Sequence, residues 1–168
     1  MGEAQSTSIT EASRQVIARY WRIAEDAADR GGLSDEEAEA RIRRFLHEDV
    51  VYEVMGSTPV SGVHDGLDTV IRDVLQTTKP RLSEYTSEVE QIIAEGDTVV
   101  VRSKNTGAIG PTGLPYDNRY CFIYTVRDGK IAKVVEYMDT QLTHTALFGQ
   151  QDACAGGHTC LVDFAASS

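Results

Sequence analysis

The stretch that decides the fold runs from Asn118 to Thr140 and reads NRYCFIYTVRDGKIAKVVEYMDT. Two apolar segments in it flank Arg127–Lys130, which carries the Asp-Gly pair typical of tight β-hairpin turns. We therefore predict two antiparallel strands, at residues 116–126 and 131–140, that pair along their whole length.

Working upstream, the sequence predicts two more strands of the same meander, at residues 83–94 and 98–107, joined by a turn at Gly96. A Gly/Pro-rich loop, GAIGPTGLP, leads from them into the hairpin. Apolar residues at helical spacing predict three helices before the meander, and a short apolar run predicts one early strand. These segments are residues 10–30, 34–46 and 67–77 for the helices and 49–55 for the strand.

Helices early in the chain and a long antiparallel sheet late in it are typical of an α+β fold. We expect a curved antiparallel sheet, shaped like a cone, wrapped around the three N-terminal helices. A twisted sheet of this kind leaves a conical cavity, and such cavities bind small molecules. We assign residues 1–148 to a single domain and residues 149–168 to a C-terminal tail.

The composition of the chain restricts the partners and the cellular location that we expect for it. The 168 residues carry a formal net charge of −10, which disfavours nucleic acid as a partner. No apolar run approaches the ~20 residues that span a membrane, and the N-terminus lacks a signal peptide, so we expect a cytoplasmic protein.

Cys154, His158 and Cys160 lie in the tail, where a zinc site would need a fourth ligand. A flexible tail or a disulfide there are the alternatives, and we expect neither metal nor cofactor.

Two stretches resemble a known family: HEDVVYEVMGSTPVSG, from His47 to Gly62, and the closing hairpin with its DGKI and EYMD segments. They are similar to the SnoaL-like branch of the nuclear-transport-factor-like superfamily, over about residues 10–148. That group includes polyketide cyclases, ketosteroid isomerases and limonene epoxide hydrolases.

The resemblance implies a cofactor-independent enzyme acting on an apolar polyketide, terpenoid or steroid-like compound. The reaction would be a cyclisation, isomerisation, dehydration or epoxide opening by general acid/base catalysis. The alternative is a module of the same fold that binds a small molecule or dimerises without catalysis.

By position, the resemblance makes Asp139 the general acid/base, at the end of the last strand. Glu136 is the second candidate, because strand alternation turns it to the opposite face unless a bulge intervenes. Arg102 would orient the pocket carboxylate, and Tyr52 would donate a hydrogen bond to the substrate.

Five further residues are candidates for substrate binding. Tyr20 lies in a helical segment similar to the one that carries the tyrosine of ketosteroid isomerases, and Phe122 falls near the position of their second donor. Packing in the core or exposure on the surface is the structural alternative for each of them. The five are Tyr20, Trp21, His64, Phe122 and Tyr137.

The strands also predict an assembly. Val99, Val100 and Val101 place apolar side chains on both faces of one strand, and Val134 and Val135 do so on another. Strands that are apolar on both faces are usually buried on both. We therefore predict a homodimer through the outer face of the sheet.

Overall fold

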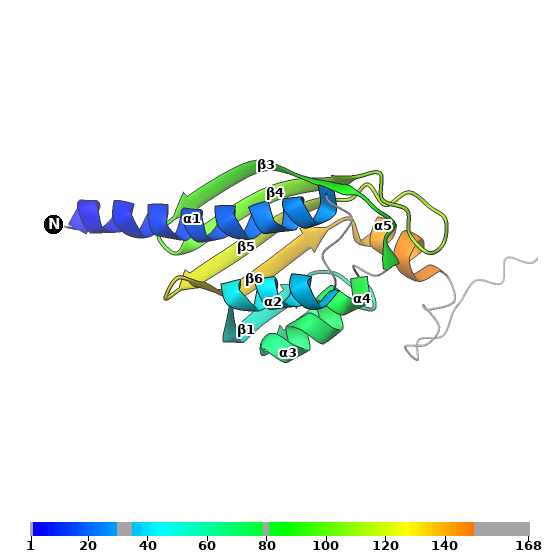
Figure 1. Ribbon diagram of the computed structural model, residues 1–168, viewed down its shortest axis with the longest axis horizontal. Coiled ribbons are helices and arrows are strands. Elements are labelled where there is room, and N and C mark those ends of the chain that lie inside the picture. Colours follow the sequence, from blue (N-terminus) through cyan, green and yellow to red (C-terminus); the bar gives the residue numbers. More distant parts are fainter. Residues whose placement is uncertain (1, 30–34, 79–80, 150–168) are drawn as a thin grey trace, which may run out of the picture.

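The computed structural model describes residues 2–29, 35–78 and 81–149, which form one curved six-stranded sheet with helices packed against it (Figure 1). The elements in chain order are α1 (Gly2–Asp29), α2 (Asp35–Phe45), β1 (Leu46–Val54), β2 (Gly62–Asp65), α3 (Leu67–Val70), the π-helical turn η1 (Ile71–Leu75), α4 (Gln76–Thr78), β3 (Thr86–Glu95), β4 (Thr98–Thr106), β5 (Arg119–Arg127), β6 (Lys130–Met138), α5 (Thr140–Thr143) and a second π-helical turn, η3 (His144–Phe148).

The strand order β2-β1-β6-β5-β4-β3 confirms the predicted meander, because β3 to β6 follow one another as antiparallel neighbours. The turn between β5 and β6 is the predicted Asp-Gly turn, with positive φ at both Asp128 (52°) and Gly129 (73°). Two features depart from the expectation. β1 runs parallel to β6, and the segment between β1 and α3, for which no strand was predicted, contains the short strand β2, which pairs with β1.

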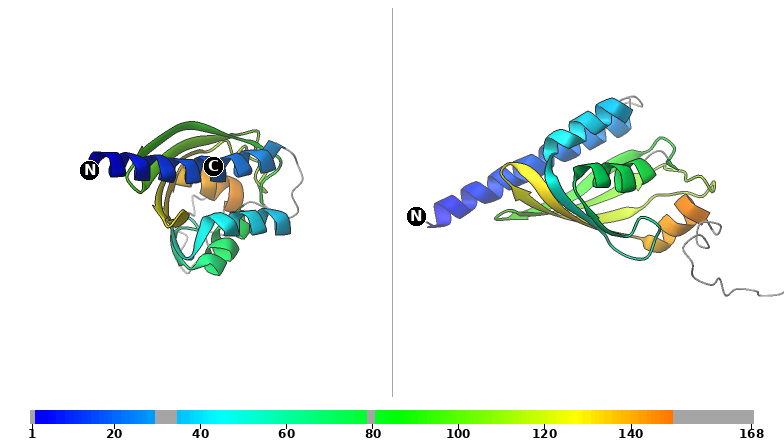
Figure 2. Two further views of the ribbon diagram at one scale, coloured as in Figure 1. Left: turned by 60° about the vertical axis from the view of Figure 1, so that its left-hand side comes forward. Right: turned by 90° about the horizontal axis from the view of Figure 1, so that it is seen from below.

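The helices lie on the concave side of the sheet, as the α+β prediction requires (Figure 2). α1 packs along β3 and β4, while α3 packs on β1 and β2. Alternate residues of the strands face these helices and form the core, for example Val99 and Val101 on β4, both fully buried. None of the helices in the described part of the chain combines the length and the apolar character that a membrane crossing requires.

One irregularity in β6 decides which of its side chains face inward. Thr125 pairs with Lys133, but the next residue, Val126, pairs with Ile131, so β6 has one extra residue at Ala132. This β-bulge shifts the alternation, because the extra residue has no partner across the strand pair. Ile131 and Val134 are therefore both buried, although they are three residues apart.

The last strand is shorter than predicted. β6 ends at Met138, and α5 and η3 follow at once, at the end of the sheet away from the N-terminus (Figure 1). The predicted tail lies outside the described residues apart from Gly149, and so do Cys154, His158 and Cys160.

Candidate functional site

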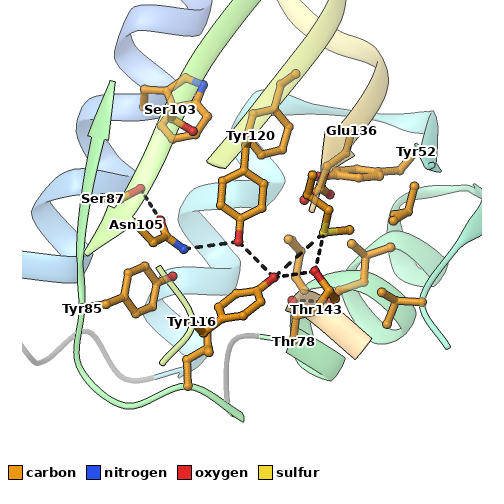
Figure 3. Close-up of a pocket in the computed structure, with 18 of the residues that line it drawn as sticks. Tyr52, Thr78, Tyr85, Ser87, Ser103, Asn105, Tyr116, Tyr120, Glu136 and Thr143 are labelled. Carbon is orange, nitrogen blue, oxygen red and sulfur yellow. Dashed lines mark hydrogen bonds between the residues drawn. The ribbon is translucent and has the colours of Figure 1, made fainter. Parts of the chain in front are cut away.

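A cavity of about 140 Å³ lies between the concave face of the sheet and the helices. Eight of the twenty described residues in its wall are aromatic, and most of these come from α1, β1, β5 and the loop before β5 (Figure 3). Its aromatic residues are Tyr20, Trp21, Tyr52, Tyr85, Tyr116, Tyr120, Phe122 and Tyr124.

Glu136 is the buried carboxylate of this cavity. Only 8% of the residue is exposed, and its Oε2 accepts a hydrogen bond of 2.7 Å from the hydroxyl of Tyr52. Burial raises the pKa of Glu136 from 4.5 to about 7, and the Tyr52 hydrogen bond opposes that rise. No hydrogen bond from the rest of the described chain reaches Oε1, so this oxygen is free to act on a ligand.

Backbone pairing explains why these two side chains meet. In the parallel β1–β6 pair, Tyr52 stands opposite Val134 and Val54 stands opposite Glu136. Tyr52 and Glu136 are therefore diagonal neighbours on the concave face. The bulge at Ala132 is essential to this arrangement, because without it Val135 and Tyr137 would face the cavity.

Besides Tyr120, three tyrosine hydroxyls lie close enough to Glu136 to feel its charge. Burial, and after it the charge of Glu136, raises the pKa of Tyr20 to about 12. The same two causes raise the pKa of Tyr52 well above 10, and both also contribute at Tyr124 together with the neighbouring Tyr20. All three phenols are consequently protonated near neutral pH and can donate hydrogen bonds beside the carboxylate.

The opposite end of the cavity is lined by a hydrogen-bonded chain of polar side chains (Figure 3). The Asn105 amide donates to Tyr120 Oη (3.3 Å), and Tyr120 donates to Tyr116 Oη (3.1 Å). Tyr116 Oη lies 3.1 Å from Thr143 Oγ1, which donates to the Asp139 carbonyl oxygen. Each of these hydroxyls therefore already has partners within the protein.

Asp139 does not face the cavity, contrary to our prediction. It is exposed, follows the last residue of β6, and its Oδ1 accepts a hydrogen bond from the Leu142 amide (3.0 Å). This is the geometry of a helix N-cap, here at the start of α5. The buried Asn118 side chain fixes the Asp139 backbone through contacts with both its N–H and its carbonyl oxygen.

Arg102 and Tyr137 also point away from the cavity. Arg102 lies between two inward-facing residues of β4, so its guanidinium is on the outer face, where it pairs with Glu90 at 3.4 Å. Tyr137 is 44% exposed, because the bulge gives its neighbour Glu136 the inward position. The predicted orientations of both are wrong.

His64, a predicted substrate-binding residue, lies on β2 and is not part of the cavity wall. Its Nε2 is 3.0 Å from the Val60 carbonyl oxygen, and its Nδ1 is 4.0 Å from an Asp73 carboxylate oxygen. These contacts tie β2 to the segment before it and to η1. In contrast, the structure places Tyr20, Trp21, Tyr52 and Phe122 in the cavity wall, and their roles toward a substrate stay predictions.

Sequence reasoning missed the residues that close the far end of the cavity: Asn105, Tyr116, Asn118, Tyr120 and Thr143. They come from β4, from the segment around the start of β5 and from α5, and only the fold brings them together. No group of three or more His, Cys, Asp or Glu side chains in the described residues could hold a metal ion.

Comparison with known proteins points to one family. A family model described as a SnoaL-like domain matches residues 26–134, about two thirds of the chain. No curated protein matches the sequence.

Three solved structures share the fold. An NTF2-like protein of Burkholderia xenovorans LB400 is 21% identical, with a TM-score of 0.62 over 82% of this chain and 96% of its own. A protein of Jannaschia sp. CCS1, provisionally named a SnoaL-like polyketide cyclase, is 22% identical, with a TM-score of 0.62 over 83% and 93%. An LEH-like epoxide hydrolase of M. tuberculosis is 19% identical, with a TM-score of 0.56 over 79% and 86%.

Proposed function

The chain belongs to the SnoaL-like domain family, and from that premise we propose that it is a cofactor-independent enzyme in which Glu136 is the general acid/base. The substrate is a small, mostly apolar molecule with a carbonyl group. In the step that we propose, Glu136 Oε1 removes a proton from the carbon next to the carbonyl and returns it to the same or another atom. Isomerisation and cyclisation through an enol share this step.

One observation carries the proposal: a buried carboxyl with a pKa of about 7 in an aromatic cavity wall. A general base works best when its pKa lies near the working pH, and burial moves this carboxyl there. Tyr52 holds Oε2, so the carboxylate presents Oε1 in a fixed direction. The hydroxyls of Tyr20 and Tyr124 lie near enough to help stabilise negative charge that develops on a substrate oxygen.

The cavity limits the size of the group that reacts. Ligand sites usually measure roughly 300–1,000 Å³, whereas a cavity of about 150 Å³ is known to hold benzene. The cavity here, at about 140 Å³, therefore accommodates a single ring or one end of a longer chain. A compound of one six-membered ring is the appropriate probe.

The test is the exchange of the α-hydrogens of cyclohexanone for deuterium in D₂O, followed by NMR. We expect the native protein to catalyse the exchange, with a rate that rises through an apparent pKa of about 7 as Glu136 ionises. Glu136→Gln should lower the rate roughly 10²- to 10⁴-fold, the usual cost of losing a general base. Asp139→Asn is the matched control, since it removes a carboxylate outside the cavity, and should retain the native rate. Equal rates for the native protein and Glu136→Gln would refute the assignment.

The second candidate function is small-molecule binding without catalysis. The observation that favours it is the composition of the cavity wall, in which Glu136 is the sole carboxylate among the described residues. In that case the native protein binds cyclohexanone but does not accelerate the exchange above the rate in buffer.

A further inference from the structure

Two polar side chains in the cavity wall have no hydrogen-bond partner within the described residues: the indole Nε1 of Trp21 and the hydroxyl of Ser103. Trp21 is 7% exposed and Ser103 is 1% exposed, so bulk water does not satisfy them. Leaving such a group unpaired costs about 1–3 kcal/mol, and native proteins contain few of them. Two in one cavity therefore indicate a place where a polar ligand atom binds.

Packing holds both residues in fixed positions. The Trp21 ring lies edge-on to Phe122, with centroids 5.3 Å apart, and makes a second edge contact with Tyr20 at 6.5 Å. Ser103 is on β4, directly opposite Tyr120 of β5. Figure 3 shows Ser103 at the end of the cavity away from Tyr116 and Thr143. Neither side chain needs to move to meet a ligand.

Four other polar side chains of the wall are less available. Asn105, Tyr120, Tyr116 and Thr143 use one another as partners, so a ligand oxygen that bound there would have to break an existing hydrogen bond. Trp21 offers an N–H that is not used in this way. An indole N–H donates and never accepts, so its partner must be an acceptor atom such as a carbonyl oxygen.

The Trp21 N–H also lies on the same side of the cavity as the carboxylate. The indole N–H of Trp21 is directed at the Tyr124 hydroxyl and lowers the pKa of Tyr124, against the larger effect of burial, but it does not reach that hydroxyl in the geometry of a full hydrogen bond. The charge of Glu136 acts on the same Tyr124 hydroxyl. Trp21 and Glu136 therefore both approach Tyr124, and a ligand oxygen held by Trp21 lies in the neighbourhood of the carboxylate.

We propose that Trp21 and Ser103 form an oxygen subsite that selects ligands with a carbonyl oxygen on an otherwise apolar skeleton. The Trp21 N–H donates to that oxygen, and the Ser103 hydroxyl supplies a second polar contact. Binding at this subsite is independent of catalysis, but the selection of a carbon acid for Glu136 rests on the proposed function.

The test compares cyclohexanone with methylenecyclohexane, which has the same ring shape but no acceptor oxygen. Trp21 is the only tryptophan of the chain, so its indole N–H gives a single cross-peak in an ¹H–¹⁵N NMR spectrum. We expect cyclohexanone to move the indole proton downfield and methylenecyclohexane to leave it nearly unchanged. The native protein should also bind the ketone more tightly than the alkene.

Variants show whether the preference for the ketone comes from the hydrogen bond or from the shape of the cavity. Trp21→Phe and Ser103→Ala should each weaken ketone binding relative to alkene binding, roughly two- to tenfold, the equivalent of one net hydrogen bond. Val74→Ala, which changes the wall without removing a donor or a ring that packs on Trp21, should alter the two affinities alike. Ser103→Ala removes a single oxygen atom and keeps the test valid if Trp21→Phe does not fold.

Each outcome decides a different question. An unmoved indole signal, an unchanged ketone-to-alkene ratio in both variants, or no binding of either probe up to its solubility would overturn the subsite. A shifted indole signal without α-hydrogen exchange would retain the subsite and reject the proposed catalysis. Exchange of the α-hydrogens with an unmoved indole signal would reject the subsite and retain the proposed catalysis.

Discussion

Replacing Glu136 with glutamine should make the protein more stable at high pH. The folded protein holds this carboxyl at a pKa of about 7, against 4.5 in an ordinary environment. At 1.36 kcal/mol per pKa unit, the difference corresponds to about 3 kcal/mol. A buried acid with a raised pKa destabilises the fold wherever it must ionise, so this cost is absent below pH 4.5 and fully present above pH 7.

The assay is urea unfolding of the native protein and Glu136→Gln between pH 4 and pH 8.5. Between pH 4.5 and 7 the folded state binds more protons than the unfolded state, so the native protein loses stability as the pH rises. Glutamine does not titrate and can still accept the Tyr52 hydrogen bond. The free energy of unfolding of Glu136→Gln minus that of the native protein should therefore rise by about 3 kcal/mol over this range. Other titrating groups cancel in the subtraction, and a difference that stays flat with pH would refute a raised pKa at Glu136.

Three further predictions address the surroundings of the site. Tyr52→Phe removes the hydrogen bond that lowers the pKa of Glu136, so the apparent pKa in the pH profile of cyclohexanone exchange should rise by roughly one pH unit. An unchanged apparent pKa would show that Tyr52 does not hold the carboxylate. Asp139→Ala should cost about 1 kcal/mol of unfolding free energy through the lost helix cap, whereas Asp139→Asn should cost almost nothing, because asparagine is an equally good cap; equal losses in thermal unfolding would contradict this. The outer face of the sheet exposes Val63 (61%), Ile93 (54%) and Tyr137 (44%), and we propose that a second copy of the chain covers this face. Light scattering should give a dimer for the native protein at micromolar concentration and a monomer for Tyr137→Asp. A monomeric native protein would rule the dimer out.

The fold could be predicted because its signals are local. The Asp-Gly turn fixes the β5–β6 hairpin, and the turn at Gly96, where φ is 60°, joins β3 to β4 without knowledge of the rest of the sheet. The parallel pairing of β1 with β6 could not be predicted, because it joins segments about 80 residues apart. β2 was missed since it has only four residues, most of them exposed, and no apolar pattern.

The site was half predicted. Tyr20, Trp21 and Phe122 were predicted to bind substrate and Tyr52 to donate to it, and all four lie in the cavity wall, but the choice between Glu136 and Asp139 failed on one backbone detail. The strand was assumed to be regular and to extend through Asp139, whereas it contains a bulge and ends at Met138. The sequence does contain a signal for this. Lys133 favours the solvent side, and counting in twos from Lys133 places Val135 and Tyr137 outside and Glu136 inside.

The extra residue at Ala132 decides which side chains of β6 after it face the cavity and which face the outer side of the sheet. A single insertion or deletion at this point therefore has consequences for how this fold evolves. Deleting this single residue would exchange the two faces of the strand beyond it, moving the carboxylate of Glu136 to the surface and the ring of Tyr137 into the cavity. The hairpin, the sheet order and the helices could all survive such a change. A one-codon insertion or deletion at this point is therefore a short route by which a lineage with this scaffold gains or loses an acid/base group, and sequence alignments that place gaps in this strand carelessly will equate residues on opposite faces of the sheet.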